Sequence, residues 1–324
     1  MMEYRIRTKR SDEWIEKYKG SQVTPDMIEL KVEGKCRILK PNGKPLLVYL
    51  PGAAKEISDE VYPNFADIRM PTENRGYAAG SERKPRVEGS KRARAVPVLS
   101  GILGSFEATG PAQYCRLTAF TAQKVNEWEK LLPYFRVIAE LFEAHVPERF
   151  AAQMVAVENT SPDWVIDGTP FTTITVNNTY PTGLHTDKGD LDEGFSTLGV
   201  MRRGHYVGGW LSFPQYGVAA DMQDGDVILM DAHEWHGNTP LLCGYCATSL
   251  DRPDHRCERI PQDIDSPERV SVVSYFRTNM VECGSLQEEQ ERRLALKEKR
   301  NAERLGLAEE VAEEAAGINP EEGA

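Results

Sequence analysis

The sequence predicts an α+β protein, with a jelly-roll β-core, flanking N-terminal helices and a C-terminal helical extension. Two patterns carry this prediction. Residues 121–150 place apolar side chains at helical spacing, and from residue 170 onward short β-branched segments alternate with glycine-containing turns. Short strands at such spacing are typical of a sandwich or jelly roll, so the two patterns together indicate helices packed on a β-core.

The composition is that of a folded protein. The chain has 324 residues, of which 40% are hydrophobic and 27% charged, which suits a packed core. A net charge of -11 argues against a protein that coats nucleic acid or an anionic membrane. No apolar run approaches the roughly 20 residues of a membrane span, and the N-terminus lacks a secretory signal. Six cysteines in a chain of this length do not suggest a disulfide scaffold, so we expect a cytoplasmic, reducing location and no secretion.

A β-hairpin is predicted within the N-terminal region, residues 1–68. Residues 36–39 and 46–50 are strand-like, and they flank the turn signal Pro41-Asn42-Gly43. Asn-Gly favours the positive φ angles of a tight turn, which brings two strands into antiparallel pairing.

Basic residues dominate the next segment, residues 69–94. Eight Lys and Arg residues stand there against three Glu, an excess of +5, and glycines are interspersed. This composition predicts a mobile basic loop. The acidic excess lies elsewhere, because residues 301–324 hold seven Glu and one Arg, a charge of -6. The net charge therefore describes the tail more than the rest of the surface.

Residues 121–150 are the predicted helical part, and Pro133 should split it into two helices or kink one, because proline lacks a backbone N–H. The strands predicted after it are residues 172–176, 195–201, 209–213, 226–230 and 270–276.

A charged C-terminal helix and acidic tail complete the chain, over residues 285–324. Ser285 and Glu288 fit a capping box at the start of the helix. Apolar residues are sparse along it, so we expect an exposed arm or a helix that contacts a partner.

The most informative motif is His185-Thr-Asp187. Residues i and i+2 of a strand project to the same face, so this imidazole and carboxylate can meet one metal ion. A third ligand must come from a distant strand, and His233 and His236 are the candidates. Two His and one carboxylate form the facial triad of non-haem Fe(II) oxygenases, which leaves three positions open. A 2-oxo acid can occupy two of them and O2 the third.

A late strand supplies a cation for the far carboxylate of a dicarboxylate co-substrate. Arg269 and Ser271 share one face of this strand. The planar fork of arginine matches a carboxylate better than lysine does. The combination of the triad motifs with an Arg-x-Ser strand is far more specific than His-x-Asp alone.

Five segments of the chain resemble the TET/J-base-binding-protein (JBP) family of 2-oxoglutarate/Fe(II)-dependent dioxygenases. They are Thr172-Thr-Ile-Thr-Val-Asn177, His185-Thr-Asp-Lys-Gly-Asp190, Gly208-Gly-Trp-Leu-Ser-Phe-Pro214, His233-Glu-Trp-His-Gly-Asn-Thr-Pro240 and Arg269-Val-Ser-Val-Val-Ser-Tyr. The resemblance implies a double-stranded β-helix (cupin-like) domain over residues 95–284. It also implies hydroxylation of the 5-methyl group of a pyrimidine base, 5-methylcytosine or thymine, in DNA.

By motif, the resemblance assigns Fe(II) to His185, Asp187 and His236, and 2-oxoglutarate to Arg269. His236 is preferred to His233 because Gly-Asn-Thr-Pro240 follows it as in the family pattern, which leaves His233 a supporting or structural role.

Further site candidates keep two interpretations each. Asp190 either accepts a hydrogen bond from the cytosine amine or thymine N3–H, which does not decide between the bases, or closes a turn. Asn177 either bridges 2-oxoglutarate or holds the loop. Trp235 either lines the site or packs in the core. His205 and His255 are expected at the surface, and His145 at a helix end.

An insertion, residues 241–268, separates the distal His from the Arg strand. It contains four soft ligands that suit tetrahedral zinc, with Cys283 as a substitute for one of the last two; the alternative is a loop with free cysteines. The four are Cys243, Cys246, His255 and Cys257.

A DNA partner would require base flipping, because a methyl group within a duplex lies out of reach of a buried iron. Cations must then hold the backbone, and Arg92 and Arg94 of the basic loop are the candidates, the alternative being a solvated loop.

Two other functions stay open. One is the same oxygenase chemistry on a small molecule, a free nucleotide or a protein side chain. The other is a non-enzymatic module that binds modified DNA, which the intact triad with Arg269 disfavours.

Overall fold

The computed structural model describes residues 1–72, 84–85, 93–94, 98–110, 112–243 and 268–317. Most of the basic loop and most of the cysteine-containing insertion therefore lie outside the described residues. Side chains are described for fewer positions, because those of residues 84–85, 93–94, 243 and 307–317 are left out.

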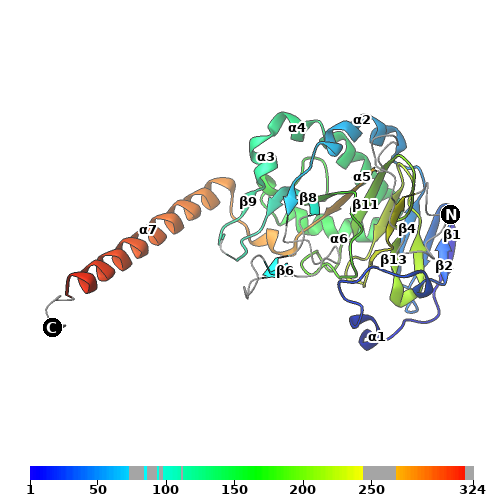
Figure 1. Ribbon diagram of the computed structural model, residues 1–324. Helices are drawn as coiled ribbons and strands as arrows, with labels where there is room; N and C mark the ends of the chain where they lie inside the picture. Colours follow the sequence, from blue (N-terminus) through cyan, green and yellow to red (C-terminus); the bar gives the residue numbers. More distant parts are fainter. Residues whose placement is uncertain (73–83, 86–92, 95–97, 111, 244–267, 318–324) are drawn as a thin grey trace, which may run out of the picture.

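A long mixed sheet forms the centre of the molecule (Figure 1). Its strand order is β1 (Met2–Arg5), β3 (Cys36–Leu39), β4 (Pro45–Leu50), β15 (Val227–Met230), β11 (Ser196–Arg203), β18 (Glu268–Tyr275), β10 (Thr173–Asn178), β8 (Val98–Phe106) and β5 (Pro71–Thr72), with β9 (Arg116–Leu117) paired to β8.

A smaller sheet faces the long one, in the order β16 (Gly237–Asn238), β13 (Leu211–Phe213), β14 (Val218–Ala220) and β2 (Leu30–Val32). Two short pairs complete the strands: β12 (Tyr206–Gly208) with β17 (Leu241–Cys243), and β6 (Lys84–Pro85) with β7 (Ala93–Arg94).

The helices are α1 (Asp12–Glu16), α2 (Lys55–Ala66), α3 (Ala119–Gln123), α4 (Val125–Glu129), α5 (Leu132–His145), α6 (Pro147–Glu158) and α7 (Leu286–Gly317). Helices α2 and α5 pack on the face of the long sheet opposite the small sheet, whereas α1 packs in a separate cluster with Val23, Met27 and Leu184, and α7 extends away from the body (Figure 1). Short 3-10 turns are η1 (Pro25–Met27), η2 (Pro162–Trp164), η3 (Pro214–Tyr216) and η5 (Thr278–Glu282). No helix of the described chain combines the length and the apolar character that a membrane crossing requires.

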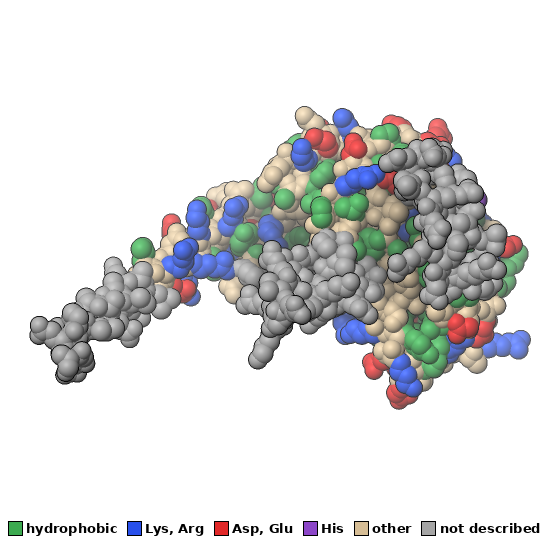
Figure 2. All heavy atoms as spheres, in the orientation of Figure 1, with side chains coloured by type: hydrophobic (Ala, Val, Ile, Leu, Met, Phe, Trp, Pro, Cys, Tyr) green, Lys and Arg blue, Asp and Glu red, His purple; other side chains and the backbone are tan. Residues whose placement is uncertain are grey.

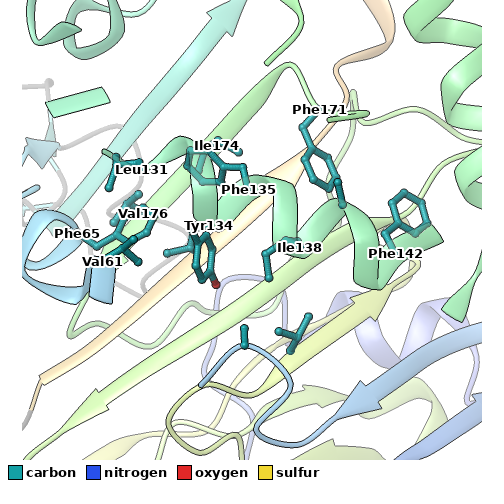
Figure 3. Close-up of a cluster of buried hydrophobic side chains, with 14 of the residues drawn as sticks. Val61, Phe65, Leu131, Tyr134, Phe135, Ile138, Phe142, Phe171, Ile174 and Val176 are labelled. Atoms are coloured by element: carbon teal, nitrogen blue, oxygen red, sulfur yellow. The ribbon is translucent and has the colours of Figure 1, made fainter. Parts of the chain in front are cut away.

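The alternation of side chains along the strands builds two cores. In β15, Val227 and Leu229 point toward the helices, whereas Ile228 and Met230 point toward the small sheet. Figure 3 shows the first core, where α2, α5 and strand β10 meet. Its labelled side chains are Val61, Phe65, Leu131, Tyr134, Phe135, Ile138, Phe142, Phe171, Ile174 and Val176. Two facing sheets with helices on one side confirm the predicted jelly-roll arrangement.

The predicted local elements are confirmed in order. The hairpin is β3–β4, and Gly43 takes a φ of 81° in its turn, where a side chain would be strained. Pro133 lies in the first turn of α5, so the helical region is split rather than kinked. The five predicted strands correspond to β10, β11, β13, β15 and β18.

The start of α7 is fastened to the body. The predicted capping box forms, since the Ser285 hydroxyl accepts from the Glu288 N–H and the Glu288 carboxylate accepts from the Ser285 N–H. The buried Glu289 carboxylate accepts from two backbone N–H groups. A disulfide joins Cys115 to Cys283, and the composition argument did not anticipate it because 168 residues separate the two cysteines.

Candidate metal centre and substrate cavity

Three side chains predicted as metal ligands converge at one point. Ligand atoms of His185, Asp187 and His236 all lie within 4.8 Å of one another. His185 and His236 are direct antiparallel partners, because each donates its backbone N–H to the carbonyl of the other at 2.9 Å. Asp187 continues the pairing through its N–H, which donates to the carbonyl of Ala232. The backbone pairing of two distant segments therefore creates the cluster.

Backbone carbonyls set the orientation of both histidine rings. His185 Nδ1 lies 2.8 Å from the carbonyl oxygen of Gly183, and His236 Nδ1 lies 2.9 Å from that of Glu234. A ring held this way carries its proton on Nδ1 and presents the Nε2 lone pair. The two Nε2 atoms lie 3.5 and 3.6 Å from the two carboxylate oxygens of Asp187. Both lone pairs thus face the carboxylate, as a shared ion requires.

The protonation state of His236 also suits a metal. Burial and the neighbouring His185 ring lower the pKa of His236 to about 4. Its imidazole is therefore neutral at physiological pH, and the neutral form is the one that binds metals. Two imidazoles and one carboxylate whose ligand atoms converge on one point fit the Fe(II) facial triad.

A small polar cavity of about 100 Å³ opens beside the triad. The inner faces of β10 and β18 supply Asn177 and Ser271 to its wall. Asp190 lies on another side, where its carboxylate accepts from the Ser196 hydroxyl at 2.7 Å. Burial and the nearby Asp187 raise the pKa of Asp190 well above its usual range. The cavity therefore joins the metal ligands to groups that can hydrogen-bond a polar substrate.

Arg269 is buried with an unused donor. It lies on the same face of β18 as Ser271, and it is only 4% exposed. Its Nη2 atom has no hydrogen-bond partner among the described residues, and neither has the hydroxyl of the nearby Tyr206. An arginine stays charged even when burial lowers its pKa, so this site calls for an anion. A carboxylate such as that of 2-oxoglutarate fits the donor set.

The structure separates the alternatives left open for other residues. Trp235 packs against the buried cluster of Ile15, Val23, Met27 and Leu184, and it is not among the residues that line the cavity beside the triad. His233 supports the site: its Nε2 lies 3.2 Å from the carbonyl oxygen of Asp190, and its Nδ1 lies 3.4 Å from the Asp231 carboxylate. His205 is exposed, as expected, and His145 ends α5.

Two groups of predicted site residues are not tested. Arg92, Cys246, His255 and Cys257 lie outside the described residues, and the side chains of Arg94 and Cys243 are not described. The substitution of Cys283 into a zinc set is wrong in this structure, because Cys283 is bonded to Cys115.

A buried ion pair beside the cavity was not expected from the sequence. Arg277 lines the cavity and donates to both carboxylate oxygens of the buried Glu107. The period-2 pattern along residues 269–277 offered a signal, because Arg277 follows Arg269, Ser271 and Tyr275 at even spacing. Glu107, at the far end of β8, offered none.

Comparisons with known proteins place this geometry in a family. Residues 103–278 match Tet_JBP, the oxygenase domain of the 2OGFeDO superfamily. The thymine dioxygenase JBP1 of Trypanosoma brucei brucei is 41% identical over 145 residues, which cover 44% of this chain and 17% of that protein. JBP1-B of Trypanosoma cruzi (strain CL Brener) is 36% identical over 200 residues, which cover 61% and 21%. The chain thus spans about a fifth of the length of these relatives.

A solved structure supports the fold independently. NgTET1 in complex with 5mC DNA superimposes with a TM-score of 0.55 at 16% sequence identity, covering 86% of this chain and 90% of that one. At this level of identity the likeness concerns the fold, and it confirms the predicted double-stranded β-helix.

Proposed function

The chain belongs to the Tet_JBP family, the oxygenase domain of the 2OGFeDO superfamily, and from this premise we propose that it hydroxylates the 5-methyl group of a pyrimidine base, 5-methylcytosine or thymine, in DNA. It is a 2-oxoglutarate- and Fe(II)-dependent dioxygenase. Its cofactor is Fe(II), and 2-oxoglutarate and O2 are its co-substrates. The proposal concerns the substrate, and the observation that carries it is the polar cavity beside the triad, taken with the similarity to proteins named thymine dioxygenases.

Fe(II) would be held by His185, Asp187 and His236, and 2-oxoglutarate by Arg269 with Ser271. When bound, the metal supplies the O2-dependent oxidation that replaces a C–H bond by C–OH, with succinate and CO2 as co-products. The protein positions the metal and the co-substrate. The two backbone-held rings aim Nε2 at the metal, and the unpaired Arg269 donor fixes the orientation of the co-substrate.

The substrate base would enter the cavity in the flipped state. A methyl group in a stacked duplex cannot reach a metal with a ligand as buried as His236, so the base must leave the stack at a cost of a few kcal/mol. Asp190 and Asn177 face the cavity and offer hydrogen bonds to the polar edge of a pyrimidine. Asp190 does not distinguish the bases, because both cytosine N4–H and thymine N3–H are donors.

Mass spectrometry of nucleosides tests this proposal. The protein is incubated with Fe(II), 2-oxoglutarate and either of two duplexes of the same sequence, one with 5-methylcytosine and one whose pyrimidine methyl groups are those of thymine alone. We expect a 5-hydroxymethyl nucleoside from at least one duplex, in amounts that depend on both Fe(II) and 2-oxoglutarate.

Two results would contradict the proposal. Oxidation of free methylated nucleosides without oxidation of DNA would indicate a small-molecule substrate. Tight binding of methylated DNA without any succinate release would indicate a binding module. A duplex without methyl groups, prepared with cytosine and uracil, is the matched control and should yield no oxidised nucleoside.

A further inference from the structure

A second, larger hollow lies on the same side of the long sheet as the metal cavity. Its volume is about 600 Å³, against about 100 Å³ for the cavity at the metal. Strand β8 forms its floor, while the β9 segment, α3 and the first turns of α7 form its walls. We call this hollow the β8 groove. A volume of this size suits a ligand larger than one base.

The β8 groove begins beside the metal cavity. Ser100 of β8 lines the groove, and its hydroxyl donates to Oδ1 of Asn177 at 2.7 Å. Asn177 lines the metal cavity, and the two residues are register partners in neighbouring strands. Adjacent strands lie about 4.8 Å apart, so these two lining residues are separated by a single inter-strand spacing. A chain whose one unit occupies the metal cavity can continue into the groove.

The described residues that line the groove include two arginines and no acidic residue. Neither Arg116 nor Arg293 has a carboxylate within ion-pair distance among the described residues. Arg116 reaches only the carbonyl oxygens of Glu107 and Tyr114, both at 3.5 Å. Because the protein as a whole carries a net charge of -11, two cations without a carboxylate partner in one groove indicate a site for an anion.

Nearby acidic groups do not cancel this charge. The Glu107 carboxylate is buried and paired with Arg277. The Glu289 carboxylate accepts from the backbone N–H groups of Cys115 and Gly284, and it pairs with Arg292. Figure 2 shows further Lys and Arg side chains along the part of α7 next to the body. The positive charge of the groove is therefore available to a ligand.

Aromatic rings alternate with these arginines. Arg116 and Phe106 are direct partners across the β8–β9 pair, so the Arg116 guanidinium lies 5.3 Å from the centre of the Phe106 ring. The Tyr114 ring lies 6.0 Å from Arg116 and 5.9 Å from Arg293. Both rings are only partly buried. Cations for phosphates interleaved with rings for bases are the pattern of sites that bind single-stranded nucleic acid.

We propose that the β8 groove binds the nucleotides that flank the flipped base, with phosphates at Arg116 and Arg293 and a neighbouring base against Tyr114. This inference rests on the proposed function, since it assigns the groove to the same DNA strand whose base enters the metal cavity. It differs from the basic-loop hypothesis, because it places the contact on β8, β9 and α7.

Binding of a fluorescent single-stranded oligonucleotide, measured at several salt concentrations, tests the inference without relying on catalysis. For Arg116→Gln combined with Arg293→Gln, we expect weaker binding and a salt slope of log K shallower by about 1.5, because each lost phosphate contact contributes about 0.7 to 0.9. Tyr114→Leu should weaken binding by about 10-fold with the slope unchanged, because base stacking contributes about 1 to 3 kcal/mol.

A matched control removes two arginines outside the groove. Arg149 stacks on Phe195 at 5.3 Å and Arg136 pairs with Asp167, so Arg149→Gln with Arg136→Gln changes the net charge equally. This control should keep the wild-type salt slope. Thermal unfolding and 2-oxoglutarate affinity of each variant check that the fold and the metal cavity are intact.

The outcomes separate the inference from the proposed function. An unchanged affinity and slope in the Arg116 and Arg293 variant would overturn the groove assignment, even if the wild type oxidises DNA. Wild-type protein that binds no oligonucleotide would also overturn it. Loss of binding in the groove variant, together with a wild type that oxidises no base in DNA, would keep the groove as a nucleic-acid site and reject the proposed reaction.

Discussion

The groups that would hold the metal and those that would hold the co-substrate are fixed in different ways, and we call the two places the metal end and the co-substrate end. At the metal end, each histidine ring is held by a backbone carbonyl, at 2.8 Å for His185 and 2.9 Å for His236. At the co-substrate end, two residues along β18 from the cavity-lining Ser271, Arg269 Nη2 and the nearby Tyr206 hydroxyl are buried without hydrogen-bond partners among the described residues. Buried polar atoms are nearly always paired, so the unpaired ones indicate where a ligand completes the structure. One end is preorganised by the protein alone, and the other by the protein with its co-substrate.

The largest effect should come from the metal end. His236→Ala removes one of the three proposed metal ligands. Mutating a residue that only hydrogen-bonds to a metal ligand typically lowers metal affinity or activity by roughly 10- to 100-fold. Removing the ligand itself should therefore lower succinate formation by at least about 100-fold. Metal binding, followed by the absorption of Co(II), should be lost in parallel. His205→Ala, an exposed histidine elsewhere, should retain both. Normal Co(II) binding by the His236 variant would exclude His236 as a ligand.

The co-substrate end should respond next. Arg269→Leu removes the buried cation, and charge-assisted hydrogen bonds of about 1.5 to 3 kcal/mol predict a 2-oxoglutarate affinity weaker by roughly 10- to 100-fold. Calorimetry with Co(II)-loaded protein measures this loss independently of turnover. Arg269→Lys should recover part of the affinity, because it restores the charge without the fork. Arg136→Leu, at the surface, serves as the control. Equal 2-oxoglutarate affinities in wild type and Arg269→Leu would show that Arg269 does not bind the co-substrate carboxylate.

A change in the wall of the metal cavity, at Asp190, should affect the DNA substrate alone. Asp190→Asn retains the shape of a buried side chain but exchanges an acceptor for a donor at one position. We expect kcat/KM for methylated DNA to fall by about 10-fold, the equivalent of about 1.4 kcal/mol, with 2-oxoglutarate affinity unchanged. Asp26→Asn, at an exposed aspartate of η1 that does not line the cavity, should have no such effect. A change in 2-oxoglutarate affinity instead would assign Asp190 to the co-substrate end.

The smallest effect should be a pH-dependent change in the stability of the folded protein, caused by the His233–Asp231 pair next to the metal end. Hydrogen bonding to Asp231 is the main cause that raises the pKa of His233 to about 9, and Asp231 itself has its pKa lowered to about 2. A histidine with a raised pKa stabilises the folded state fully below its unfolded pKa of about 6.5, and this stabilisation disappears as the pH rises through 9. Asp231 stays ionised above about pH 4, so it does not alter this window.

His233→Gln tests this window in metal-free protein. The difference in Tm between wild type and variant should be largest near pH 5 to 6.5 and should shrink toward pH 9. His205→Gln is the control, because this histidine is exposed and lies on another element. A difference that grows with pH would show that His233 is neutral in the folded protein.

Local chemistry made much of the molecule predictable. His185 and Asp187 share a face because of the two-residue period of a strand, and Pro133 and Ser285 mark helix starts through the properties of single residues. The choice of His236 depended on a motif, and the structure brings its ring together with His185 and Asp187. The position of Trp235 could not be predicted, since the direction of one side chain within a turn depends on what packs against it.

The sequence by itself determined the strand and helix periods, the residue types of the candidate metal centre and the family of the fold, because these depend on residue types at short or fixed spacing. Only the tertiary structure decided which distant groups meet: the Glu107–Arg277 pair, the Cys115–Cys283 bond and the β8 groove. Each joins residues more than 150 positions apart or on separate elements. Such meetings follow from the packing of the sheets and from burial, which no local pattern encodes.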